Sequence, residues 1–96
     1  MSAPYGSSPV FDENSLPDAL RGEHRTKAGT WGLLRVLEGE VRLVFKGAPA
    51  PLLVTVDHPA MIPPEAPHHV ECIGPMRMLV EFYRTPPVIG LDVGNE

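Results

Sequence analysis

Apolar and polar residues alternate with a period of two along much of the segment 30–83, and this period is typical of β-strands. In the segment 41–46, Val41, Leu43 and Phe45 share one face and the residues between them share the other. The pattern predicts further strands at 30–37, 52–56, 60–62, 68–73 and 76–83. Residues of the turn-forming types Gly, Pro and Asp separate most of these strands, so we expect tight turns.

Residues 38–40 (Glu-Gly-Glu) separate two of these strands, and we expect a β-hairpin there in which Gly39 supplies a positive φ. A helix is expected only at 15–20, which is short and carries Pro17 near its start. Short strands at intervals of about ten residues indicate an all-β sandwich or barrel. A barrel leaves fewer exposed strand edges, so the predicted fold is an all-β barrel.

The barrel is expected to be a single domain over 10–85, because no repeat or linker interrupts this range. Residues 1–9, rich in Ser, Pro, Gly and Ala, are expected to form a flexible N-terminal tail. Residues 86–96 are expected to form a C-terminal tail that docks on a second copy. Its large apolar residues are Val88, Ile89, Leu91 and Val93. A small domain buries a limited core, so we expect a homodimer that uses this tail.

Composition excludes several classes of function. The 96 residues carry a formal net charge of −4, which gives no electrostatic basis for binding nucleic acid or an anionic membrane. No apolar stretch approaches the roughly 20 residues that a membrane-spanning helix needs, and the N-terminus lacks the pattern of a secretory signal. The single cysteine, Cys72, favours a reducing cytoplasm and is expected to be a buried small side chain.

Candidate metal ligands occur in three places: Glu23-His24, His68-His69-x-Glu71, and Glu81 in the last strand. Two imidazoles and a carboxylate suit Zn, Fe(II), Mn or Ni. In a regular strand His68 shares a face with Cys72, whereas His69 and Glu71 share the other face. His68 and Glu71 can therefore act together only if the strand bends.

A purely structural role is also open to several polar and aromatic residues. Glu81, in an apolar strand, needs a partner if it is buried, and Arg35 or Arg42 can serve instead of a metal. His58, in a turn before a proline, is expected to be structural. Trp31 is expected to belong to the core or to a pocket wall.

Two sequence blocks resemble the cupin-like domain family of bacterial tellurite-resistance proteins (TehB/YeaR-like), within the cupin superfamily. The first block is 22–32 (GEHRTKAGTWG) with 35–39 (RVLEG), and the second is 63–71 (PPEAPHHVE) followed by 80–83 (VEFY). The blocks cover most of 11–85. The resemblance implies a double-stranded β-barrel of the cupin or jelly-roll type with a metal-type pocket in its mouth.

The family pattern implies His24, His68 and Glu71 as metal ligands, with Glu81 at a usually acidic position. Trp31, His69 and Tyr83 are also expected to line the pocket. The chain lacks the HxH of the superfamily's first motif, and Gly32 stands at its glutamate position. The superfamily's second motif, PxGxxH, selects His69 instead, with Pro64 and Ala66 at its other positions. The closer family pattern favours His68, and the choice between Glu71 and Glu81 stays open.

The favoured function is a metal-binding module, a binding or accessory protein in a stress or tellurite and oxyanion resistance response. The first alternative is a metal-dependent cupin enzyme, such as a non-haem-iron oxygenase or a hydrolase acting on a small molecule. The second alternative is an assembly domain whose histidines are structural. Fold analogy alone does not choose among them.

Overall fold

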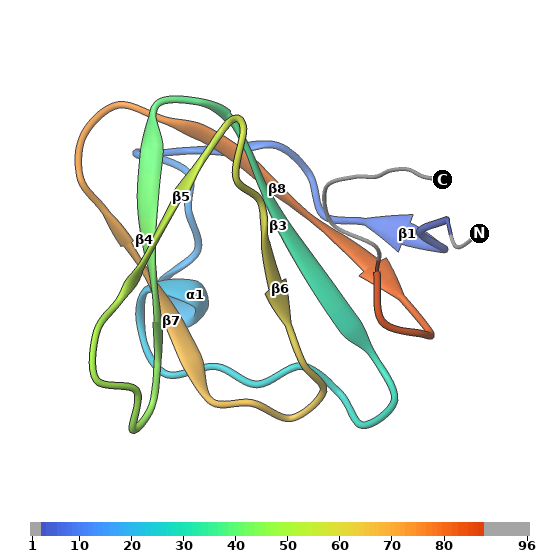
Figure 1. Cartoon of the computed structure of the whole chain (residues 1–96). Coiled ribbons are helices and arrows are strands. Elements are labelled where there is room, and N and C mark those ends of the chain that lie inside the picture. Colours follow the sequence, from blue (N-terminus) through green and yellow to red (C-terminus); the bar gives the residue numbers. More distant parts are fainter. Residues whose placement is uncertain (1–2, 88–96) are drawn as a thin grey trace.

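The barrel is built from two antiparallel sheets, seen in the computed structural model, which describes residues 3–87 (Figure 1). The elements are β1 (Gly6–Ser7), β2 (Phe11–Asp12), α1 (Asp18–Arg21), β3 (Trp31–Glu38), β4 (Glu40–Phe45), β5 (Leu52–Thr55), β6 (Ala60–Ile62), β7 (His68–Cys72) and β8 (Arg77–Tyr83). The predicted all-β fold is therefore confirmed. Strands β3 to β8 each begin within one residue of the predicted start.

The larger sheet has the order β1-β8-β3-β6, with β2 also paired to β8, and the smaller sheet has the order β5-β4-β7. The two sheets face each other and enclose the core (Figure 1). Strict alternation explains this arrangement, because each strand places every second side chain on the inner face. The core is lined from both sheets by Leu34, Val36, Val41, Leu43, Val54, Val70 and Met78.

The expected hairpin around Gly39 is not present. β3 pairs with β6 and β8, whereas β4 pairs with β5 and β7, so residues 38–40 carry the chain from one sheet to the other. Gly39 does have the expected positive φ, 73°. A Cβ at Gly39 would clash with the carbonyl oxygen of Pro75, so the crossing also needs a residue without a side chain.

The N-terminal segment corrects a second expectation. Residues 1–9 were expected to be a flexible tail, but Gly6 and Ser7 form β1 against β8. The Ser8 side chain strengthens this pairing, because its Oγ accepts a hydrogen bond of 2.9 Å from the backbone N–H of Val80. A short helix does form near the expected place, at Asp18–Arg21, with Pro17 as its N-cap.

The C-terminal tail lies largely outside the described residues. The four apolar residues expected to dock on a second copy, Val88, Ile89, Leu91 and Val93, belong to the segment 88–96 that the structure does not describe. The homodimer therefore stays a prediction. Within residues 3–87, no helix is long and apolar enough to cross a membrane.

Candidate functional site: a cleft above a histidine pair

His24 and His68 lie side by side at one end of the barrel, although 44 positions separate them in the sequence. Their backbones form a small antiparallel bridge, in which each N–H donates to the other's carbonyl, at 2.7 and 2.8 Å. The two rings meet edge to face, with centroids 5.5 Å apart. The backbone bridge thus brings together two of the four residues predicted as metal ligands.

His68 is held as a neutral ring with a defined tautomer. Its side chain lies on the inner face of β7 and is only 3% exposed. Its Nδ1 is 2.8 Å from the carbonyl oxygen of Ala66, and a carbonyl can only accept, so Nδ1 carries the proton. Burial lowers the pKa of His68 below 6.5, against the opposing effect of the Ala66 hydrogen bond.

Two neighbouring hollows are lined in part by this pair. An open cleft of about 430 Å³ is lined by Tyr5, His24, Arg25, Thr26, Lys27, Thr30 and Phe82. A smaller cavity of about 60 Å³ is lined by Leu20, His24, Thr26, Ile62, His68, Val80 and Phe82. His24, Thr26 and Phe82 border both, so the cleft adjoins the inner cavity at His68.

Thr26 fixes the segment that carries this site. Its Oγ1 donates to the carbonyl of Pro63 at 3.0 Å and accepts from the backbone N–H of Glu65 at 3.1 Å. Glu65 itself has a positive φ of 61°, a conformation uncommon for residues other than glycine. The 22–30 segment and the proline-rich turn 63–67 are therefore joined at the end of the barrel where the site lies (Figure 1).

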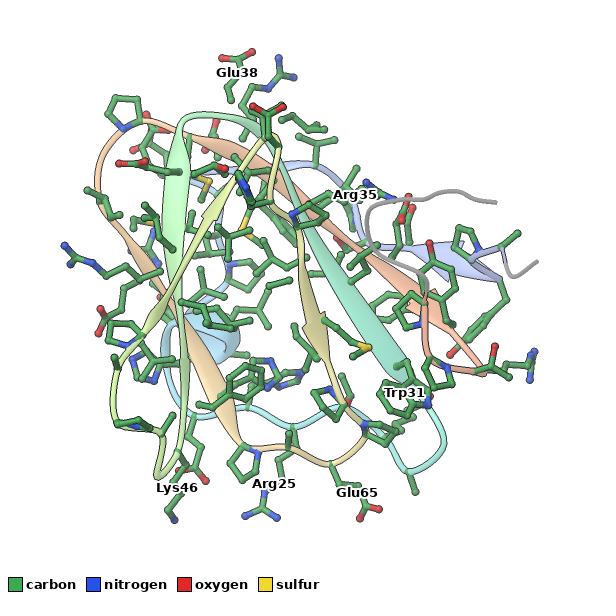
Figure 2. The ribbon with its side chains drawn as sticks, in the orientation of Figure 1. Arg25, Trp31, Arg35, Glu38, Lys46 and Glu65 are labelled. Carbon is green, nitrogen blue, oxygen red and sulfur yellow. The ribbon has the colours of Figure 1, made fainter. Side chains whose placement is uncertain are left out.

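The rim of the cleft is cationic. Arg25 and Lys27 both line it, and Arg25 projects from that end of the barrel (Figure 2). A third cation, Arg84, lies over the ring of Tyr5 at 4.5 Å from its centroid. Arg25 has only a long contact of 3.8 Å to the exposed Glu23, so its charge is weakly neutralised. This positive rim stands out on a chain whose net charge is −4.

Glu71 and His69 lie away from the pair. As the alternation predicted, both side chains point to the outer face of β7 while His68 points inward. His69 Nε2 and Glu71 Oε2 are 3.1 Å apart, so these two side chains are partners of each other. No bend in β7 brings Glu71 to His68, because the pairing of β7 with β4 is regular from Phe45↔His68 to Val41↔Cys72.

Glu81 has the partner that the sequence offered as the alternative to a metal. Its Oε1 accepts a hydrogen bond of 2.7 Å from Arg35 Nε and another of 2.9 Å from the hydroxyl of Tyr83. The hydrogen bond to Glu81 raises the pKa of Arg35. Burial, and then the carboxylate, raise the pKa of Tyr83. This cluster lies on the outer face of the larger sheet, opposite the face that carries the cavity.

Three residues predicted to line the pocket lie elsewhere. Neither the cleft nor the inner cavity includes Trp31, His69 or Tyr83. Trp31 and Tyr83 are directly opposite each other in the pairing of β3 with β8, and both point to the outer face. Strand alternation explains the difference, since the cavity is bordered by Val80 and Phe82, which point inward from β8.

The described donors do not complete a metal site. Among residues 3–87, no group of three or more His, Cys, Asp or Glu side chains is placed to share one ion. Structural zinc sites use four protein ligands and catalytic ones three, and the non-haem iron triad needs a carboxylate beside its two histidines. His24 and His68 alone therefore do not fit a resident divalent metal, and the metal ion stays a prediction.

The part of the chain that carries the histidine pair matches a known protein family. A family model described as the TehB-like domain matches residues 6–80, most of the chain. The chain belongs to the TehB-like domain family. This confirms the resemblance to the domain of tellurite-resistance proteins. The matched range includes β1, the histidine pair and the two rim cations Arg25 and Lys27.

Two curated relatives are about one-third identical to this TehB-like domain. Both are described as a probable S-adenosyl-L-methionine-dependent methyltransferase TehB, from two strains of Haemophilus influenzae, 10810 and KW20. Each is 32% identical over 74 residues, which cover 72% of this chain and 26% of the relative. The chain therefore spans about a quarter of the length of the curated relatives it matches.

Solved structures agree with the fold. The crystal structure of TehB from Haemophilus influenzae matches with a TM-score of 0.77 and 30% identity, over 85% of this chain and 31% of that one. A protein of E. coli K12 matches with a TM-score of 0.76 and 19% identity, over 94% and 93% of the two chains. A chain from the crystal structures of the DMSP lyases RdDddP and RnDddQII matches with a TM-score of 0.55 and 22% identity, over 78% of this chain and 33% of that one. The last two likenesses concern the fold alone.

Apart from His24, the residues that form the rim and walls of the cleft were not predicted from the sequence. Arg25 and Lys27 flank Thr26 within the conspicuous block 22–32, and this pair of cations beside His24 was the available signal. Tyr5 was missed because it lies in a segment expected to be a tail. It reaches the cleft because its backbone N–H donates to the carbonyl of Phe82 at 2.8 Å.

Proposed function

We propose that this TehB-like domain is a binding module for a small oxyanion, acting in a stress response such as tellurite or oxyanion resistance. The ligand occupies the cleft above His24 and His68, and Arg25 and Lys27 attract it. The observation that carries the proposal is a cationic rim on a negatively charged chain, placed over a cavity that ends at two histidines.

The dimensions of the site favour a small ligand. The outer cleft, about 430 Å³, falls within the usual range for small-molecule sites, and the inner cavity of about 60 Å³ has room for only a few atoms. Tyr5 and Phe82 supply aromatic surface along the cleft beside the rim charges. The relation to proteins named TehB, of the tellurite-resistance family, makes tellurite and its selenium analogue the first probes.

The alternative of a metal-dependent enzyme has less support. It needs a carboxylate beside the histidine pair, and Glu71 and Glu81 have partners on outer faces of the two sheets. Binding without chemistry needs only the rim and the cavity. A chelator added to the protein is therefore expected to leave oxyanion binding unchanged.

Isothermal titration calorimetry with tellurite and with selenite tests the proposal. The double variant Arg25→Ala/Lys27→Ala is expected to bind the same anion at least about tenfold more weakly, because two charges close to the ligand are removed. Arg42→Ala is the control, since Arg42 is also an exposed cation but lies on β4, away from the cleft. Absence of binding by the parent protein, or equal weakening in the control, would overturn the proposal.

A further inference from the structure

His68, which lines the inner cavity, carries a hydrogen-bond acceptor on its ring. Because Nδ1 of His68 donates to the carbonyl of Ala66, the other ring nitrogen, Nε2, carries a lone pair. No hydrogen bond within residues 3–87 involves this Nε2. The residue is only 3% exposed, so this acceptor has little contact with bulk water.

The side chains around His68 are mostly apolar and provide few hydrogen-bond donors for Nε2. Leu20, Ile62 and Val80 are apolar walls of the cavity, and Phe45 lies on another side of the ring, with centroids 6.0 Å apart. His24 meets the ring edge to face without a hydrogen bond between the two side chains. The cavity, at about 60 Å³, is large enough to admit an oxygen atom beside Nε2.

We propose that the bound oxyanion donates a hydrogen bond from its own hydroxyl group to Nε2 of His68, so that the site takes anions that still carry an O–H and rejects fully ionised ones. This rests on the proposed function and names its ligand class. A fully ionised oxyanion presents only lone pairs, and it would leave the buried Nε2 unpaired and facing negative charge. Sites built around one buried polar group discriminate strongly against ligands that lack the partner group.

The histidine does not become a donor to suit a fully ionised ligand. The ring is only 3% exposed, and apolar side chains form much of the cavity wall, so there is little solvent there to stabilise a charged imidazolium. The backbone hydrogen bond to Ala66 also holds the tautomer, because exchanging the proton to Nε2 would leave two acceptors facing each other. The ligand must therefore supply the hydrogen-bond donor to Nε2.

Two matched pairs of anions test this at pH about 7, by calorimetry at constant ionic strength. Phosphate and selenite carry an O–H at this pH, whereas their partners sulfate and selenate do not. We expect the protonated member of at least one pair to bind about 100-fold more tightly than its partner. A fully ionised member that binds as tightly as its partner would overturn the inference and leave the proposed function standing. If none of the four anions binds, and tellurite does not bind either, both proposals fail.

A substitution identifies the nitrogen responsible. His68→Gln offers an amide that can turn either its oxygen or its nitrogen to the ligand, so the preference is expected to fall to less than about tenfold. His69→Gln is the matched control, because His69 is the next residue on β7 and points to the outer face. A preference that persists in His68→Gln, or that falls equally in His69→Gln, would overturn the role of Nε2. If His68→Gln does not fold, the comparison of the anion pairs in the parent protein still decides the inference.

Discussion

Perturbing the ion pair between Arg35 and Glu81 tests whether the carboxylate of Glu81 is structural or binds a ligand. Glu81→Gln keeps the shape of the side chain and removes only its charge. Arg35 Nε and Glu81 Oε1 are 2.7 Å apart, a distance typical of a strong charge-assisted hydrogen bond. The Arg35 side chain is 43% exposed and that of Glu81 21% exposed, so solvent screening reduces the value of the pair. We expect a coupling of about 1 kcal/mol.

A double-mutant cycle measures that coupling directly. Arg35→Met, Glu81→Gln and the double variant are compared by equilibrium unfolding in urea. A loss of about 1 kcal/mol is expected to lower the melting temperature by about 4–8 °C in a domain of this size. Oxyanion binding is expected to be unchanged in all three variants, because the pair lies on the face of the sheet opposite the cavity. A coupling close to zero, or loss of ligand binding in Glu81→Gln, would refute this assignment.

Three further perturbations follow from the same structure. Gly39→Ala is expected to destabilise the fold at least twice as much as Gly47→Ala in urea unfolding, since both positions have a positive φ but only Gly39 would push a Cβ against Pro75; equal losses would contradict this. The free energy of unfolding is expected to fall as pH drops below about 6.5, because the unfolded chain then binds a proton at His68 that the folded protein, with its lowered pKa, does not bind. Urea unfolding of His68→Gln should show a weaker dependence of stability on pH, and identical pH profiles for the two proteins would contradict this. Deletion of residues 1–8 is expected to lower both the melting temperature and the affinity for oxyanion, because β1 pairs with β8 and Tyr5 lines the cleft; an equally stable, equally tight-binding protein would restore the tail interpretation.

Strand positions could be predicted from the sequence because alternation is a local property. The inward set in β7, His68 with Val70 and Cys72, follows from the period of two, and the structure confirms it. Sheet membership is not local. The Glu-Gly-Glu segment at 38–40 is equally compatible with a hairpin and with a crossing between sheets, and only the partners of β3 and β4 in the two sheets show which one applies.

The site was predictable only in part for the same reason. A resemblance selected His24 and His68, and the backbone bridge between them is a long-range contact that no local pattern indicates. From the sequence, the partner of Glu81 could be Arg35, Arg42 or a metal, and the choice depended on the pairing of β3 with β8. Tyr5 reaches the cleft through two residues of strand pairing, too short a signal to separate from a tail.

Histidine NMR tests the central claim most directly. A long-range ¹⁵N–¹H spectrum of the labelled protein reports the protonation of both ring nitrogens in each of its four histidines. In the free protein we expect His68 to carry its proton on Nδ1, and on addition of selenite at pH about 7 the Nε2 signal of His68 should move in the direction of an accepted hydrogen bond, together with a change at His24. His58 and His69 should not move. A His68 protonated on Nε2 in the free protein, or one that selenite leaves unchanged, would contradict the account.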